Sequence, residues 1–76
     1  METKQITPPT PLRVLRLREV EERTGLKRAS IYRRGKVGTF PKPISLGRNS
    51  TGWIESEVEA WLADLVAQRD AQAGAQ

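Results

Sequence analysis

The sequence predicts a small, mainly α-helical domain of about three helices with one β-hairpin, arranged as a winged helix-turn-helix. Three observations lead to this fold class. Two short helical segments are separated by a Gly-Leu pair at residues 25–26. Two strand-like segments flank the turn "GRNSTG", and a long C-terminal segment repeats apolar residues every three or four positions. A chain of 76 residues has room for one such domain.

The N-terminal residues are rich in proline. Pro8, Pro9 and Pro11 withhold backbone donors and favour extended geometry in their neighbours. The last six residues, in contrast, lack any large apolar group. We therefore expect a flexible Pro-rich arm over residues 1–12, a folded winged helix-turn-helix domain over residues 13–70 and a frayed tail over residues 71–76. Residues 13–17 look like a short strand that enters the domain.

Two helices follow with a tight turn between them. The first is expected from about Arg18 to Thr24, where Gly25 can adopt the left-handed conformation that ends a helix. The second is expected from about Lys27 to Arg34 or Lys36, ended by Gly35 and Gly38. The two helices would be locked together by a small core made of Val20, Leu26 and Ile31.

The hairpin and the last helix complete the domain. Strands are expected around Ile44 to Leu46 and over the sequence "GWIE", joined by the glycine-bracketed turn. Ser56 and Glu59 match a capping box at the start of the last helix. Trp53 is expected in the core, together with the apolar positions of this helix: Val58, Trp61, Leu62, Leu65 and Val66.

Charge is distributed unevenly along the chain. The net charge is +4, yet residues 27–48 contain seven basic side chains and no acidic one, whereas residues 49–76 contain one basic and five acidic ones. A basic segment of this kind indicates a polyanionic partner that meets one face of the domain. A solvated basic surface without a partner is the alternative interpretation.

The second helix of the pair fits the major groove of double-stranded DNA, because side chains near its start would reach base edges. Arg28 can form two hydrogen bonds to a guanine, and Lys27 and Ser30 can reach a base or a phosphate. Tyr32 suits either a backbone contact or a core position with an exposed hydroxyl. The remaining candidates on this helix are expected to bind phosphates: Arg33, Arg34 and Lys36.

The hairpin resembles a wing. Arg48 and Asn49 would lie at its tip, within reach of an adjacent minor groove or sugar-phosphate strand, and Lys42 would lie at its base. An ordinary polar turn is the alternative.

Other functional classes lack their usual residues. The chain has neither cysteine nor histidine, so the usual zinc ligands and the usual general base are missing. We therefore expect no enzyme activity, no cofactor and no metal site. Without a membrane-spanning run or a signal peptide, the expected compartment is the cytoplasm.

Three stretches resemble the AlpA family of phage and prophage regulatory proteins: "LRLREVEERTGLKRASIYR", "GKVGTFPKPISLG" and "GWIESEVEAWL", which together span about residues 15–62. This family is related to winged-helix excisionases and to the DNA-binding head of MerR-type regulators. Lys27 stands where relatives often have serine, so the second helix lacks its best N-cap, at a cost of about 1 kcal/mol.

The resemblance implies a sequence-specific transcriptional regulator of a prophage or integrated mobile element. An excisionase that bends DNA and assists an integrase is the alternative, and a second copy bound to the same DNA is a further candidate partner. A third hypothesis is an adaptor without DNA binding, whose acidic last helix binds another protein.

Overall fold

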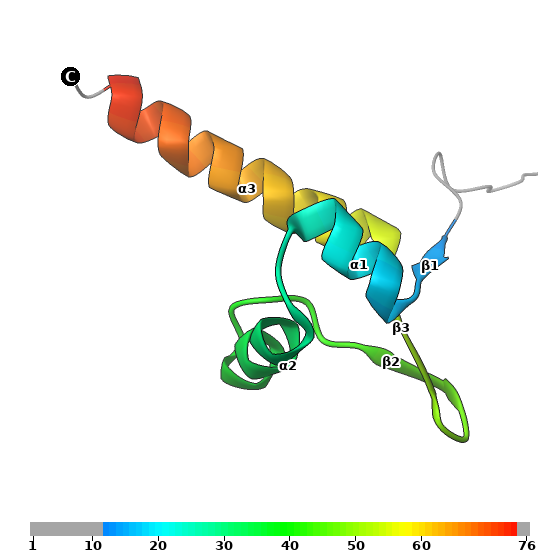
Figure 1. Ribbon diagram of the computed structural model, residues 1–76. Coiled ribbons are helices and arrows are strands. Elements are labelled where there is room, and N and C mark those ends of the chain that lie inside the picture. The colour runs from blue at the N-terminus through cyan, green and yellow to red at the C-terminus, as the bar shows by residue number, and fades with distance from the viewer. Residues whose placement is uncertain (1–11, 75–76) are drawn as a thin grey trace, which may run out of the picture.

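The computed structural model describes residues 12–74, and Figure 1 shows how its helices and strands are arranged. In chain order these elements are β1 (Val14–Leu15), α1 (Leu17–Thr24), α2 (Arg28–Val37), β2 (Ile44–Gly47), β3 (Ser50–Ile54) and α3 (Glu55–Gly74). A mainly helical domain with three helices and a small antiparallel hairpin agrees with the winged helix-turn-helix expected from the sequence. The predicted arm lies almost entirely outside the described residues.

The strands form one antiparallel sheet in the order β1-β3-β2. Val14 pairs with Ile54 and Leu15 with Trp53, so the entry strand joins the hairpin as a third strand. Sequence analysis predicted this strand but not its pairing. Because β3 lies between the other two strands, the hairpin is tied directly to the start of the domain.

Gly52 is required where β1 crosses β3. A Cβ atom at this position would overlap the side chain of Val14, and it would also lie 3.2 Å from Leu46 Cδ1 and 3.3 Å from the Leu15 carbonyl oxygen. Only glycine allows this close approach without moving a strand.

The core joins the three helices, β1, β3 and Phe40 around Trp53. Its fully buried members are Leu15, Val20, Ile31, Phe40, Trp53 and Val58. Leu17, Leu26, Trp61 and Leu62 pack against this cluster while keeping some exposure. The predicted small core of Val20, Leu26 and Ile31 is therefore confirmed as part of a larger one.

Glycines shape both ends of the turn-and-helix unit. Gly25 caps α1 with φ 76°, as predicted. Gly38 caps α2 with φ 88°, whereas Gly35 is buried inside that helix. The prediction that Gly35 helps to end α2 was wrong, because a glycine facing the core can be tolerated for its small size alone. Lys27 is the N-cap of α2 and makes no side-chain cap hydrogen bond, in line with its departure from serine.

A cluster of ion pairs holds α1 against α3. Arg23 Nη2 lies 2.7 Å from Glu55 Oε2, and its Nη1 lies 2.6 Å from Glu59 Oε2. The hydrogen bond to Glu55, helped by the charges of Glu55 and Glu59, raises the pKa of Arg23 despite some desolvation. Arg13 reaches the same Glu55 carboxylate at 3.8 Å.

The start of α3 differs from the prediction. The helix begins at Glu55, whose N–H donates to the Arg13 carbonyl oxygen over 2.8 Å. Glu59 bonds Arg23 in place of the Ser56 backbone, so the capping box expected from Ser56 and Glu59 is not formed.

The C-terminal half of α3 extends beyond the rest of the domain, as Figure 1 shows. Leu65 and Val66 are 42% and 47% exposed, which makes their predicted place in the core wrong. Their spacing continues the apolar stripe, but among residues 12–74 the core cluster does not extend to these two side chains. Within residues 12–74, no helix combines the length and apolar character needed to cross a membrane.

Candidate nucleic-acid interface

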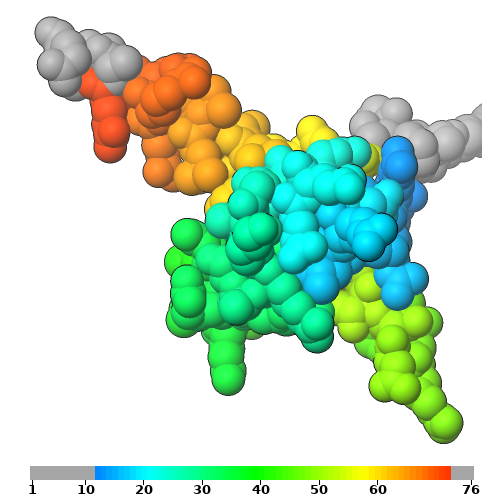
Figure 2. All heavy atoms as spheres, viewed as in Figure 1, coloured from blue at the N-terminus to red at the C-terminus, as the bar shows by residue number. Residues whose placement is uncertain are grey.

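One face of the molecule is hollowed between α2 and the hairpin, which project on either side of the hollow in Figure 2. We call this hollow the hairpin groove. It has a volume of about 450 Å³ and is lined by α1, α2 and the sheet. Its lining residues are Arg16, Leu17, Arg18, Arg28, Tyr32, Asn49, Thr51 and Trp53. Arg16 at the N-cap of α1, Arg18 of α1 and Arg28 of α2 therefore meet one residue of the hairpin tip.

The hairpin groove is held open by contacts at its edges. Arg16 Nε donates to the Thr51 carbonyl oxygen over 3.0 Å, which ties the N-terminus of α1 to the returning strand. The Arg16 backbone N–H donates to Glu19 Oε1 over 2.8 Å, so the start of α1 is capped at the same point. These bonds hold both the backbone and the guanidinium of Arg16 in place, and the residue as a whole remains exposed.

Tyr32 forms the ridge beside this groove. Its ring packs edge-on against Trp53, with centroids 5.7 Å apart and an interplanar angle of 61°. The residue is nevertheless 40% exposed, and the Arg28 guanidinium lies 5.9 Å from its ring centroid. The packing agrees with the interpretation of Tyr32 as a core aromatic, and its outer part is exposed.

A second hollow, the loop groove, lies on the other side of Tyr32. It is lined by Tyr32, Gly35, Lys36, Lys42 and Pro43 and has a volume of about 540 Å³. Lys36 comes from α2 and Lys42 from the segment before β2, so two of the lysines predicted to bind DNA converge here. The side of α2 that carries Arg28, Tyr32 and Lys36 is therefore flanked by a basic hollow at each end.

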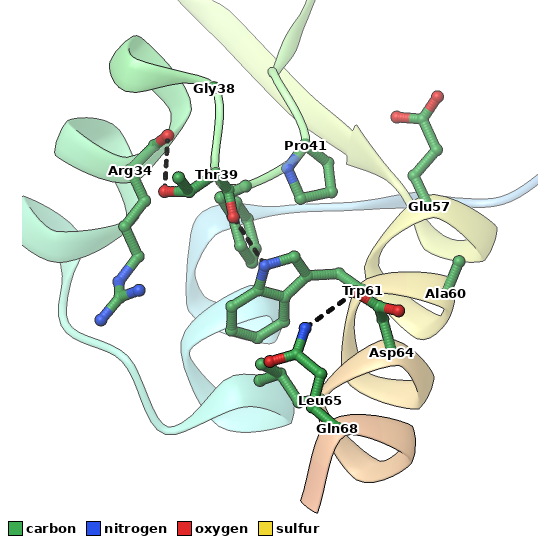
Figure 3. A pocket seen from close by; sticks show the side chains of 11 residues that line it. Arg34, Gly38, Thr39, Pro41, Glu57, Ala60, Trp61, Asp64, Leu65 and Gln68 are labelled. Carbon is green, nitrogen blue, oxygen red and sulfur yellow. Dashed lines mark hydrogen bonds between the residues drawn. The ribbon is translucent and has the colours of Figure 1, made fainter. Parts of the chain in front are cut away.

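The predicted residues of α2 divide between two sides of the helix. Arg33 is exposed, and its Nη2 lies 3.4 Å from Ser30 Oγ. Arg34 instead lines a third hollow, the α3 groove, together with residues of α3 (Figure 3). It is partly buried, and its Nε has no hydrogen-bond partner among residues 12–74. Arg34 is thus separated from the other predicted phosphate ligands. Lys27 is exposed at the start of α2.

The hairpin tip has the geometry of a tight two-residue turn. Gly47 has φ 138° and Asn49 has φ 56°, a left-handed value that asparagine tolerates better than most residues. Asn49 also lines the hairpin groove, and Arg48 is exposed beside it. The predicted wing residues therefore lie at the tip, with Asn49 on the side of α2.

The basic candidates share an electrostatic property. Among residues 12–74, the arginines that form ion pairs with acidic side chains are Arg13, Arg23 and Arg69. No acidic side chain of the described chain pairs with any of the seven basic residues predicted to bind DNA, which are Lys27, Arg28, Arg33, Arg34, Lys36, Lys42 and Arg48. Their positive charge is available to an external anion.

Sequence reasoning missed Arg16, Arg18 and Thr51 as groove residues. In the sequence, Arg16 and Arg18 stand close to Glu19, Glu21 and Glu22, so the net charge of this segment is nearly neutral. That net charge does not indicate where the two arginines lie in space. The available signal was the repeated Leu-Arg pattern at the start of α1, where arginines two apart flank a partly buried leucine.

Comparison with known proteins agrees with the family suggested by the three sequence stretches. The profile of the family described as "Prophage CP4-57 regulatory protein (AlpA)" matches residues 13–66. This chain belongs to the AlpA family. Its relatives include the "Uncharacterized protein ORF88" of Enterobacteria phage P4, 41% identical over 70 residues that cover 84% of this chain and 80% of the relative.

A second relative of this AlpA-family chain is the "DNA-binding transcriptional activator AlpA" of Escherichia coli. It is 43% identical over 58 residues, which cover 68% of this chain and 83% of the relative. No solved structure was found to match the chain.

Proposed function

We propose that this AlpA-family protein binds double-stranded DNA in a sequence-specific manner and regulates transcription of a prophage or integrated mobile element. The observation that carries the proposal is the hairpin side of α2, where a helix is flanked by two hollows whose cations form no ion pair within residues 12–74. The E. coli relative, whose name describes a DNA-binding transcriptional activator, supports the same function.

The proposed docking places α2 in the major groove. A helix with its side chains is about 10–12 Å wide, which matches the roughly 12 Å width of the groove. Arg28 would face the base edges from the first turn, whereas Arg33 would contact a phosphate. The hairpin and loop grooves would then receive phosphates of the two strands that border the major groove, because both hollows lie beside α2.

The hairpin would act as the wing. Arg48 is exposed at its tip, and Asn49 lies between the tip and the hairpin groove. We expect Arg48 to contact the sugar-phosphate strand or the adjacent minor groove, which adds affinity without changing the preferred sequence. An Arg48→Ala variant should therefore weaken binding to every duplex by a similar factor.

A salt titration of binding to a labelled duplex tests the electrostatic part of the proposal. About five phosphate contacts would give a slope of log affinity against log salt near −4 to −5. A slope close to zero would exclude the proposed interface and favour the adaptor hypothesis. Footprinting on DNA around the protein's own gene tests the sequence-specific part, since it reports protection at a defined site.

The excisionase alternative uses the same interface and differs in what happens to the DNA. An excisionase should bend its site and bind cooperatively with an integrase or with a second copy of itself. Gel-shift mobility of a series of circularly permuted fragments measures such bending. Mobility that depends on where the site lies in the fragment would favour the excisionase role over transcription regulation. The proposed interface would stay the same.

A further inference from the structure

The α3 groove lies on the opposite side of α2 from the hairpin and has a volume of about 730 Å³. Figure 3 shows its two walls, one made by the segment after α2 and the other by α3. The wall from α3 carries Glu57, Ala60, Trp61, Asp64, Leu65 and Gln68. The facing wall carries Arg34, Phe40 and Pro41, so the apolar side chains lie between two polar edges, of which the one at Arg34 is basic.

Trp61 is fixed in this groove. Its indole N–H donates to the Thr39 carbonyl oxygen over 2.7 Å, and its ring meets Phe40 edge-on with centroids 4.8 Å apart. These contacts leave the indole partly exposed beside Leu65, which is 42% exposed. The groove is therefore a rigid aromatic surface without an apolar cover among residues 12–74.

The edge of the groove on α3 is acidic. Glu57 and Asp64 are exposed, seven residues apart and thus on the same side of the helix. Neither carboxylate pairs with a cation in the described part of the chain, although Asp64 accepts a hydrogen bond from Gln68 Nε2 over 3.1 Å. An occupant with apolar rings and a positive charge would complement this groove.

The N-terminal segment of the same chain has this chemistry. Residues 1–11 lie outside the described residues, but their sequence contains Pro8 and Pro11 in a Pro-x-x-Pro pattern, with Lys4 upstream. Segments of this type dock as polyproline II helices into aromatic-lined grooves. We propose that residues 4–11 of this chain dock in the α3 groove, with the prolines against Trp61 and Lys4 near Asp64.

The attachment point and the length of the segment permit this docking. The Arg13 carbonyl oxygen accepts from the Glu55 N–H over 2.8 Å, so the described chain begins beside the first residue of α3. Lys4 and Arg13 are nine positions apart in the sequence. A polyproline II helix covers about 28 Å over nine positions. Glu55 and Asp64 are about 14 Å apart along the helix. The difference leaves enough chain to pass around α3, which is about 10 Å wide.

A second copy of α3 would fit the same surface less well. Beyond the core, the exposed large apolar side chains of this helix are Leu65 and Val66. Two such side chains cover far less area than the roughly 800 Å² that each partner buries in a typical stable interface. The acidic C-terminal part of two copies would also repel. The N-terminal segment avoids both problems because it adds proline rings and Lys4.

Paramagnetic broadening in the full-length protein tests the proposal. The chain lacks cysteine, so Thr3→Cys introduces a single attachment site for a nitroxide spin label. With ¹⁵N-labelled protein, we expect the Trp61 indole and Leu65 amide signals to lose most of their intensity, and the Trp53 indole signal much less. Equal, weak broadening of all three signals would overturn the proposal.

Variants and mixing identify the contacts. Replacement of Pro8 and Pro11 by alanine, or Asp64→Lys, should restore the Trp61 signal, whereas Glu22→Lys, an exposed charge reversal on α1, should not. Persistence of the broadening in the first two variants would contradict docking through these residues. Spin-labelled protein of natural isotope abundance, mixed with ¹⁵N-enriched protein that carries no spin label, should cause no broadening. Broadening in the mixture would replace docking within one chain by exchange between two copies.

Discussion

Arginines occupy opposite electrostatic situations on two sides of this domain. Where α1 meets α3, Arg13 and Arg23 lie close to the carboxylates of Glu55 and Glu59. On the side formed by α2 and the hairpin, Arg16, Arg18 and Arg28 share one hollow without an acidic partner among the described residues. The first group is used to assemble the fold, and the second is left available for an external anion.

The largest effect should come from the tryptophan beneath the second side. Trp53 is 1% exposed and supports Tyr32, so Trp53→Ala should cost about 3–5 kcal/mol of the free energy of unfolding. In a domain of this size such a loss unfolds much of the population. Trp61 is only partly buried, and Trp61→Ala should cost less. Sequence analysis expected both tryptophans in the core.

Urea denaturation followed by far-ultraviolet circular dichroism measures both losses without relying on tryptophan fluorescence. Equal destabilisation by the two substitutions would mean that α3 contributes as much to the core as β3 does. Trp61→Phe serves as the control, because it keeps an aromatic ring while removing the hydrogen bond to Thr39.

The next effect separates the two groups of cations. An Arg18→Ala/Lys42→Ala variant removes one cation from each groove beside α2, and the salt slope of DNA binding should become less steep by about 2. Thermal stability should change little, because neither side chain makes an ion pair within residues 12–74.

An Arg13→Ala/Arg23→Ala variant is the matched control. It should lower the midpoint of thermal unfolding and leave the salt slope unchanged, because these arginines pair with Glu55 and Glu59. The pKa of Arg23 is raised above an unfolded-state value that is already high, so the guanidinium is charged in both the folded and the unfolded state at ordinary pH. Its contribution to stability is therefore constant over that pH range. A loss of DNA affinity in this variant, at a temperature where it remains folded, would remove the distinction between the two sides.

A smaller effect concerns sequence preference. Arg28→Ala should reduce discrimination at one base pair by about 1–3 kcal/mol, because two hydrogen bonds to a guanine edge are lost. Arg28→Lys keeps the charge but not the paired geometry, so it should retain most affinity for random DNA while losing the preference. Binding of wild type and both variants to single-base-pair substitutions of the footprinted site measures this. Uniform weakening on all sequences would make Arg28 a phosphate ligand of the hairpin groove.

Local pattern was sufficient to predict the helix pair and the hairpin. Gly25, Val20 and Ile31 specify the turn and its core through short-range spacing, and the glycine-bracketed turn specifies the hairpin. Such features depend on neighbours close in sequence. The register of β1 on β3 depends on contact between segments about 40 residues apart, which no local pattern encodes, and Gly52 acquires its importance only from that contact.

The candidate interface, like the fold, could be predicted in part. Sequence analysis identified the basic residues of α2 and the wing, but it treated α2 as one exposed face. Packing against α3 on one side and the hairpin on the other divides that helix, so that Arg34 is separated from Arg28 and Lys36. Arg16 and Arg18 join the interface through folding alone.

The smallest predicted difference tests this division of α2 with two adjacent arginines. Arg33 is exposed, and Arg33→Ala should make the salt slope less steep by about 1 if it contacts a phosphate. Arg34 lines the α3 groove, so Arg34→Ala should leave the slope and the affinity for DNA unchanged. The two variants have the same composition and net charge, which removes any general effect of charge on binding. Equal losses would mean that α2 rotates or tilts on DNA until both arginines reach the duplex, and the hairpin side would then no longer define the interface.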